Sequence, residues 1–403
     1  MSKHVIVVGG GIVGAAAAYF AAREGMAVTL LEKEHVGYGA SGRNPGFVWL
    51  HCRNPGWALD ISRAGRRLYD ELLRDLPAPF EFRAEGGLIY FTTDEQAAVF
   101  SEFARARRRD GLDMQLIDGA QVRRLVGPIR HDVLGASFCG DDAQINTPTV
   151  VHALTMGAKS EGALVKEGAE VLGLVRSGAD VVGVDTVQGR LTADAVVVAT
   201  GAWTTPLLAT AGIQARIGRE RLQVLATKPR PLDIKPVVYG PLAAKQYSLF
   251  RDLPSWREEA FLAPYEIETG RWMLQLVAQR ANGETLLGCP MDYPAEVTHD
   301  TTLSGIGAIA ASIAADFPGL KDVPVDRVWS GVLPFTSDMA PIIDEVSPGL
   351  FVAAGHVFGN AAGPMTGKLL AQLLRGVTTD LDLTECRWDR ELDPITPGEA
   401  MHW

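Results

Sequence analysis

The chain opens on an apolar, largely β-branched run at residues 5–9 that breaks into glycines. The next segment, residues 11–24, is rich in alanine and closes on Gly25, which is typical of a helix and its C-cap. A second apolar run at residues 27–32 ends on Glu32. Continuous apolar runs on either side of a helix are typical of parallel strands buried on both faces. The opening segment therefore predicts a strand–helix–strand unit.

Shorter and more mixed segments follow after residue 80. Residues 80–93 predict two short strands around a turn, and Thr93 with Gln96 predicts a capping box at the start of a helix. Another short strand and a helix near residues 119–126 come next. This mixture of short strands and helices is typical of part of an α+β domain inserted into the first one.

Two later segments return to the opening pattern. A helical pattern at residues 149–161 precedes the apolar run ADAVVVATGAW, which predicts a buried parallel strand that ends near Gly201. Residues 350–354 predict a last strand, followed by a glycine-rich turn and a helix that begins near Pro364 and ends at Gly376. Alternating strand-like segments and an amphipathic helix lie between these two segments of the chain.

These patterns together predict an α/β fold of two domains. A discontinuous Rossmann-like nucleotide-binding domain would comprise residues 1–80, 145–214 and 326–403. The inserted α+β domain would comprise residues 81–144 and 215–325, and we expect it to bind the substrate on a mostly antiparallel sheet.

Composition narrows the classes of function. The chain has 403 residues, 47% of them hydrophobic, and a net charge of −10, which argues against a nucleic-acid partner. The basic run at 105–109 falls where the last turn of a helix is expected. Four scattered cysteines form no C-x-x-C or zinc pattern, and no apolar run approaches the ~20 residues of a membrane span. We expect no metal site, no transmembrane segment and a cytoplasmic location.

The glycines after the first strand carry the chemical signal. Gly9, Gly11 and Gly14 have the G-x-G-x-x-G spacing of a dinucleotide phosphate site, and Glu32 lies where an acceptor for a ribose hydroxyl is expected. NAD and FAD both use this device. A second glycine-rich strand–turn–helix at residues 350–376 is unusual for an NAD dehydrogenase and favours FAD.

Six ordered motifs carry a resemblance over nearly the whole chain: VVGGGIVG, LLEKE, GASGRNPG, VVVATGAW, WSGVLPFTSDMAPII and AAGHVFGNAAGPMTGKLLA. The chain resembles the FAD-dependent amine and amino-acid oxidoreductases of the D-amino-acid oxidase superfamily, the group of glycine oxidase and sarcosine oxidase. The resemblance implies an oxidoreductase, a flavoprotein of amino-acid oxidation, whose nucleotide-binding domain binds FAD. It implies hydride transfer from the carbon of a C–N bond to flavin N5, giving an imine that hydrolyses.

The resemblance also implies which residues hold FAD. Arg43 stands where some family members anchor the flavin covalently through a histidine, so we expect non-covalent FAD. A helix N-terminus at the second glycine-rich turn would stabilise the charge that hydride transfer leaves near N1 and O2. The expected cofactor-binding residues are Gly9, Gly11, Ile12, Val13, Gly14, Glu32, Lys33, Ala40, Ser41, Arg43, Asn44, Gly46, Val171, Gly201, Trp203, Gly331, Gly359, Asn360 and Ala361.

The substrate side departs from the family pattern. Leu333 and Phe358 stand where members of the family hold the substrate carboxylate with arginines. Either the substrate lacks a carboxylate there or another cation binds it. The candidate replacements are Arg53, Lys245, Arg251 and Arg43.

Other side chains are candidates for the substrate face. His51 and His356 are the candidate catalytic residues, although a histidine near a flavin more often fixes a loop by hydrogen bonding. Phe47 and Trp49 would line the substrate pocket. Two tyrosines of the inserted domain, Tyr247 and Tyr265, could hydrogen-bond a substrate.

We therefore expect FAD-dependent oxidation of a small amine or amino acid, in particular a secondary amine or an N-substituted amino acid. The electron acceptor would be oxygen or a quinone or other redox partner. A nicotinamide-dependent dehydrogenase is the rival enzyme class. The other alternative is a flavin-binding subunit of a heteromeric amino-acid or opine dehydrogenase complex, so either a homo-oligomer or a heteromeric partner is compatible with the sequence.

Overall fold

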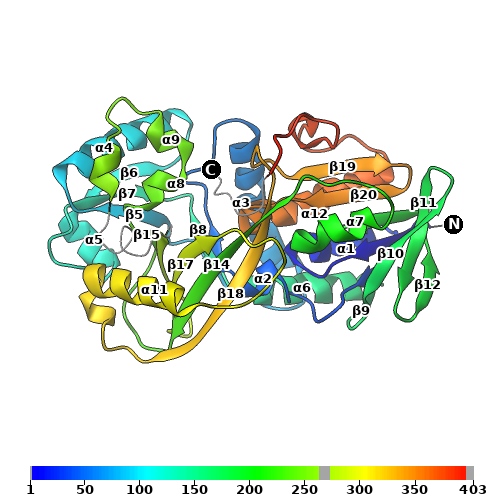
Figure 1. The fold of residues 1–403 in the computed structure, drawn as a ribbon, viewed down its shortest axis with the longest axis horizontal. Coiled ribbons are helices and arrows are strands. Elements are labelled where there is room, and N and C mark those ends of the chain that lie inside the picture. Colours follow the sequence, from blue (N-terminus) through cyan, green and yellow to red (C-terminus); the bar gives the residue numbers. More distant parts are fainter. Residues whose placement is uncertain (1, 263–272, 396–403) are drawn as a thin grey trace.

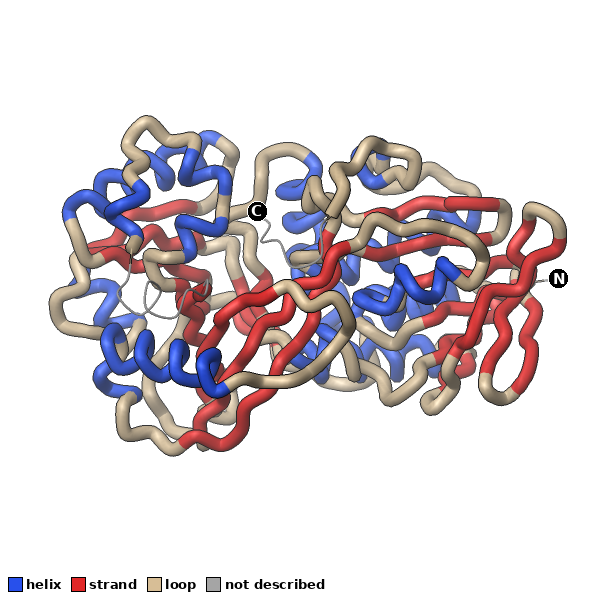
Figure 2. The backbone as a smooth tube through the Cα atoms, viewed as in Figure 1, coloured by secondary structure: helices blue, strands red, loops and turns tan. Residues whose placement is uncertain are grey.

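The computed structural model describes residues 2–262 and 273–395. Figure 1 shows an elongated molecule with one large sheet at each end, and Figure 2 shows helices packed on both sheets. The chain passes several times between the two ends, because strands far apart in sequence share each sheet. This confirms the predicted mixed α/β class with a Rossmann-like parallel sheet.

The six-stranded sheet contains the opening strand–helix–strand unit. β1 pairs in parallel with β2 on one side and with β13 on the other, with Val5 opposite Ala195. β20 extends the parallel arrangement, and only β19 is antiparallel to its neighbour. In sheet order the strands are β19 (Ile342–Ser347), β20 (Leu350–Ala354), β13 (Ala195–Val198), β1 (His4–Val8), β2 (Ala27–Leu31) and β9 (Leu164–Lys166).

Both faces of this sheet are covered, which explains its continuous apolar runs. Val5 and Val7 pack into the core under the helices, whereas Ile6 and Val8 pack into a separate core on the other face. The first core is completed by the helices α1 (Ile12–Arg23), α3 (Trp57–Asp75), α6 (Thr147–Ser160) and α12 (Gly359–Arg375). The second core is completed by α7 (Thr204–Ala209) and by a three-stranded meander of β10 (Val171–Ser177), β11 (Asp180–Thr186) and β12 (Gly189–Thr192).

The last helix begins earlier than the sequence predicts. We expected its start near Pro364, but α12 begins at Gly359, and Pro364 lies inside it. Proline has no N–H, so the carbonyl of Asn360 loses its helical partner. The hydroxyl of Tyr69 in α3 donates to that carbonyl at 2.6 Å. The tertiary contact therefore allows a proline within the helix. The predicted end is confirmed, because Gly376 caps α12 in the left-handed conformation.

The eight-stranded sheet is mostly antiparallel, as expected, with one parallel pair between β15 and β5. The helix α11 packs on β14, β16 and β17. In sheet order the strands are β18 (Val325–Phe335), β14 (Gly218–Thr227), β17 (Thr285–Asp292), β16 (Met273–Gln279), β15 (Val237–Tyr239), β5 (Gly87–Phe91), β7 (Gly135–Cys139) and β6 (Met114–Asp118); the helices at this end are α4 (Asp94–Arg109), α5 (Gly119–Leu125), α8 (Ala243–Gln246), α9 (Ser248–Arg251) and α11 (Leu303–Asp316).

The capping box predicted for α4 is only partly confirmed, because one of its two hydrogen bonds is present. The Thr93 hydroxyl accepts from the N–H of Gln96, but the Gln96 side chain accepts from Thr92 rather than from Thr93. A complete capping box occurs at α5, between Asp118 and Gln121. Both helices nonetheless begin with a side chain that satisfies a free N–H.

A small sheet joins the two ends of the molecule. Its strands are β3 (Phe47–Val48), β8 (Ala143–Ile145) and β4 (Phe82–Arg83), and β3 follows the short helix α2 (Ala40–Arg43).

The domain limits remain a prediction. The sequence assigned residues from 326 onward to the nucleotide-binding domain, but β18 hydrogen-bonds along β14 of the eight-stranded sheet. No helix within the described residues is both long enough and apolar enough to cross a membrane.

Candidate active site

One cavity of about 470 Å³ runs between the two large sheets. At one end it is lined by the turn between β1 and α1, including Gly9 and Gly11, and by Glu32 after β2. At the other end it is lined by β14 and β16 of the eight-stranded sheet. The nucleotide motif and the inserted sheet therefore face a common space.

The glycine turn between β1 and α1 packs closely against neighbouring backbone, which leaves no room for side chains at Gly9 and Gly14. Gly9 has φ +106°, and a Cβ there would lie 2.5 Å from the carbonyl oxygen of Ala199. A Cβ on Gly14 would lie 1.9 Å from the carbonyl oxygen of Gly9, so α1 packs directly on the turn. The first N–H of α1, that of Ile12, donates to the Ser41 hydroxyl at 2.9 Å.

Glu32 is positioned by the backbone around it. Its carboxylate accepts from the N–H of Gly10 at 2.7 Å and from the N–H of Glu34 at 3.0 Å, and the residue is 9% exposed. Beside it the ammonium of Lys33 lies 4.2 Å from the ring centroid of Trp203. These contacts fix the acid and the cation that the sequence placed at the nucleotide.

Two long helices begin at the cavity. α1 and α12 pack against each other through small residues, and Gly359 and Asn360 at the start of α12 line the cavity. The Asn360 side chain donates to Asn44 Oδ1 at 2.8 Å, and the Thr147 hydroxyl lies within 3.1 Å of both side chains. A helix N-terminus carries free N–H groups and partial positive charge. The cavity therefore offers two sites for negative charge.

Most of the sequence-predicted residues line this one cavity. Gly14, Gly46 and Ala361 lie just behind the wall as neighbours of lining residues, and Lys245 and Arg251 lie outside it. Tyr265 falls outside the described residues. Those that line the cavity are Gly9, Gly11, Ile12, Val13, Glu32, Lys33, Ala40, Ser41, Arg43, Asn44, Phe47, Trp49, Arg53, Val171, Gly201, Trp203, Tyr247, Gly331, Leu333, His356, Phe358, Gly359 and Asn360.

Sequence reasoning missed several lining residues of the eight-stranded sheet. Their strands alternate, so one face of each was predictable, but the sequence does not tell which face meets the cavity. These residues are Leu222 and Val224 of β14, Tyr239 of β15, Leu274 and Leu276 of β16, and Cys289 of β17.

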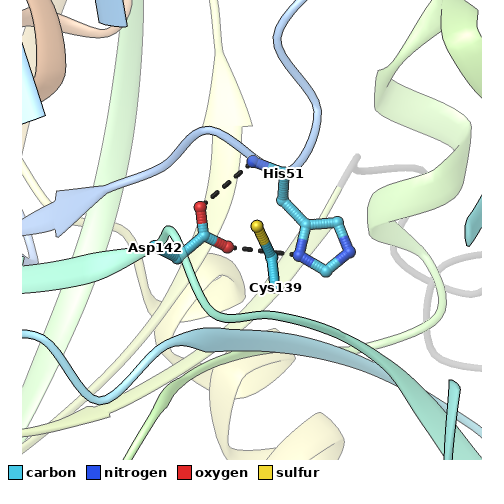
Figure 3. A group of neighbouring side chains, drawn as sticks. All are labelled: His51, Cys139 and Asp142. Atoms are coloured by element: carbon cyan, nitrogen blue, oxygen red, sulfur yellow. Dashed lines mark hydrogen bonds and ion pairs between the residues drawn. The ribbon is translucent and has the colours of Figure 1, made fainter. Parts of the chain in front are cut away.

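His51 requires a correction, because it does not line the cavity. It is fully buried, with its ring parallel to those of Trp49 and Phe103. Figure 3 shows it beside Asp142, whose carboxylate lies 3.2 Å from Nδ1 and accepts from the backbone N–H at 3.1 Å. Nε2 lies 2.9 Å from the Ser137 hydroxyl.

The His51 cluster looks like a catalytic triad or a metal site, and Cys139 lies within 4.8 Å of its ligand atoms. Both ring nitrogens already have partners, and Asp142 also accepts from the N–H of Leu50 at 2.6 Å. Burial lowers the pKa of His51, which keeps the imidazole neutral. The cluster therefore fixes the loop after β3.

His356 does line the cavity, in the turn before α12. Its Nε2 lies 3.0 Å from the Thr366 hydroxyl. Burial lowers the pKa of His356 to about 3, so the ring is neutral at physiological pH. This geometry ties the turn to the helix that follows it.

Comparison with known proteins gives the family. The family model described as FAD dependent oxidoreductase matches residues 4–373. The chain belongs to this family. It is an enzyme, and its cofactor is FAD rather than a nicotinamide.

Individual relatives of this FAD-dependent oxidoreductase agree with the resemblance seen in its motifs. It is 25% identical over 380 residues to glycine oxidase of Bacillus licheniformis, with 92% of each chain covered. It is 26% identical over 383 residues to sarcosine oxidase subunit beta of Rhizobium meliloti, covering 92% of this chain and 84% of the relative. The crystal structure of glycine oxidase from Geobacillus kaustophilus has the same fold, with a TM-score of 0.82 at 22% identity over 97% of this chain and 100% of that one.

The residues of the oxidoreductase fit FAD. A pyrophosphate needs a turn without side chains in front of a helix N-terminus, which Gly9 and Gly11 provide before α1. The cavity continues from there past Gly201 and Asn44 to the start of α12, so a long dinucleotide can reach the second helix N-terminus.

Proposed function

We propose that this enzyme oxidises the C–N bond of a small amine or amino acid, in particular a secondary amine or an N-substituted amino acid. The continuous cavity carries the proposal, because it joins the nucleotide site to a chamber walled by aromatic and aliphatic side chains. The relatives named glycine oxidase and sarcosine oxidase subunit beta support the same reaction class. The substrate would lose a hydride from carbon and a proton from nitrogen, and water would hydrolyse the imine to a carbonyl compound and an amine.

Bound FAD supplies the acceptor for the hydride pair. The chain would supply orientation and electrostatics: the N-terminus of α12 stabilises negative charge at its end of the cavity. Phe47, Trp49 and Tyr239 are buried and exclude water from the chamber. A neutral amine needs no strong base on the protein, which agrees with the neutral state of His356.

We further propose that FAD is held without a covalent bond. Cys289 lines the cavity, but burial raises the pKa of its thiol well above the usual range, so a reactive thiolate is disfavoured. Arg43, at the position of the histidine anchor, cannot form such a bond. Acid precipitation should release all of the yellow colour into the supernatant; colour retained in the pellet would contradict the proposal.

The first test is the visible spectrum of the FAD-loaded protein under anaerobic conditions, before and after addition of amines and amino acids. We expect a secondary or N-substituted amino acid to bleach the flavin band, and the carbonyl product to appear in equal amount. Readmission of air then tells an oxidase, which recolours quickly, from a dehydrogenase. A protein that takes up no FAD, or a flavin that only alcohols or thiols bleach, would overturn the proposal.

A subunit of a heteromeric dehydrogenase is the second candidate, favoured by the match to sarcosine oxidase subunit beta. In that case the purified chain would bind FAD, but an amine would bleach it only after a second chain is added. Reduction of the isolated chain at a rate that accounts for turnover would exclude this alternative.

A further inference from the structure

Arg53 occupies an unusual position at the substrate end of the cavity. The residue is only 8% exposed, and its Nε donates to the carbonyl of Trp49 at 2.9 Å. The guanidinium carbon lies 4.2 Å from the ring centroid of Phe358. Within residues 2–262 and 273–395, its two terminal nitrogens donate no hydrogen bond and form no ion pair. Two donor nitrogens, each with two N–H groups, therefore remain available at the cavity wall.

A buried guanidinium without a counter-ion is costly, because a charge withdrawn from water needs compensation. Ring contact with Phe358 supplies only part of it. The acids that line the cavity are Glu32 and Glu170, and both lie at its nucleotide end. Glu170 lies near Glu32 because the N–H of its neighbour Ala169 donates to the carbonyl of Glu32. Around Arg53, the described part of the cavity wall contains no carboxylate. A negatively charged group on a ligand would supply the missing compensation.

The backbone that carries Arg53 is held rigidly from behind. Arg107, itself buried, donates from Nη2 to the carbonyl of Arg53 at 2.6 Å and from Nε to the carbonyl of His51 at 3.1 Å. Asp142 fixes the same loop through the N–H groups of Leu50 and His51. A preorganised arginine loses little entropy when it binds an anion.

Most of the remaining chamber wall is apolar, and Tyr239 and Tyr247 add hydroxyl groups to it. Leu222, Val224 and Leu333 come from the β14–β18 pair, and Leu274 and Leu276 from β16. A second charged group on the ligand would be buried against these side chains without a partner, which is strongly unfavourable. An aliphatic or aromatic side chain would be stabilised by burial there.

We propose that Arg53 binds the substrate carboxylate and that the substrates are monocarboxylic amino acids with an apolar side chain. This rests on the proposed amine oxidation and deepens it. Dicarboxylic, cationic and carboxylate-free amines are then poor substrates, because each leaves a buried charge unpaired.

The test is a binding titration of the FAD-loaded enzyme with redox-inert ligands, followed by the change in flavin absorbance and in tryptophan fluorescence. Acetate, butanoate and hexanoate are compared with hexanamide and hexylamine. We expect affinity to rise along the carboxylate series, and hexanoate to bind far more tightly than hexanamide. In Arg53→Gln, hexanoate affinity should fall at least about 30-fold, with the amide unchanged.

Two further variants make the result specific. Arg53→Lys keeps the charge and should recover part of the hexanoate affinity, so an effect of misfolding is separated from an effect of charge. Arg67→Gln removes the same charge from the exposed face of α3 and should behave as wild type. FAD content and melting temperature of each variant are measured in parallel.

The outcomes separate the two proposals. If amines bleach the flavin but hexanoate and hexanamide bind alike, or Arg53→Gln binds hexanoate as wild type does, the role of Arg53 is overturned and amine oxidation stands. If hexanoate binding depends on Arg53 but no amine bleaches the flavin, the anion site stands and the proposed reaction fails. Preference for a dicarboxylate over hexanoate would overturn the apolar substrate class.

Discussion

Glu220 is a buried carboxyl group in the middle of a strand. It is fully buried in β14, its Oε1 accepts from the Tyr293 hydroxyl at 3.0 Å, and Oε2 has no hydrogen-bond partner among the described residues. Burial raises the pKa of Glu220 to about 8. The side chain is therefore protonated at neutral pH, and the folded state is penalised when it ionises.

The substitution Glu220→Gln should stabilise the protein at alkaline pH. Because the folded-state pKa exceeds the unfolded value of 4.5, the unfolded state releases its proton first, and wild-type stability falls as pH rises from about 4.5 to 8. The loss is at most about 1.4 kcal/mol per pH unit. Urea unfolding between pH 5 and 8 should show a smaller loss for the variant.

An exposed glutamate provides the control for this prediction. Glu259 is exposed, and Glu259→Gln should leave the pH dependence of unfolding as in wild type. Parallel curves for Glu220→Gln and wild type would mean that the Glu220 carboxyl is not held protonated in the folded enzyme.

At the same scale, the backbone environment of a glycine is easier to predict from the sequence than the direction of a histidine side chain. Gly9 and Gly14 were predictable because their backbone positions have no room for a Cβ, a property that spacing records. His51 was expected to face the substrate because it follows the flavin loop. The direction of its side chain is instead set by Asp142 and Ser137, which lie over 80 residues later in the chain.

Among the elements, the pair α1 and α12 determines where the two helix N-termini lie. A Cβ on Gly367 would lie 2.4 Å from Cβ of Ala16 and 2.5 Å from its backbone carbonyl carbon, so the two helices touch at this point. Small residues permit this approach, and the approach brings both N-termini to one cavity.

The substitution Gly367→Ala should push α12 away from α1. We expect a loss of about 1–3 kcal/mol of unfolding free energy from overpacking and a weaker affinity for FAD, measured by urea unfolding and by titration of the apoprotein. Gly307→Ala in α11 is the matched control, since nothing lies within 4 Å of the added Cβ. It should stabilise by about 0.5–1 kcal/mol through helix propensity, with FAD affinity unchanged. Equal effects of the two substitutions would refute the packing argument.

For the whole molecule, we expect FAD bound in the cavity between the two sheets to stabilise both ends. FAD at 100 times its Kd should add about 2.7 kcal/mol to the unfolding free energy. We expect calorimetry to show a single transition of the FAD-loaded protein that moves upward as free FAD is increased. If two transitions appear and only one of them responds to FAD, the cofactor stabilises one end alone.

The sequence by itself determined the class of fold and the cofactor, and it predicts which segments of the chain bind FAD. Strand–helix periodicity and the spacing of Gly9, Gly11, Gly14 and Glu32 are local properties, because a phosphate turn is built within about thirty residues. Ordered motifs then extended this to the family, which the comparison with known proteins confirms.

Only the tertiary structure supports the proposed substrate chamber. Arg53 was one of four candidate cations, and the choice depends on burial, on the ring of Phe358 some 300 residues away, and on the absence of a described acid beside it. Likewise, Leu222 and Leu276 meet at the cavity because β14 and β16 flank β17 in the eight-stranded sheet. Contacts between distant segments leave no periodic pattern in the sequence. The residues that meet in the chamber could therefore be found only from the packed structure.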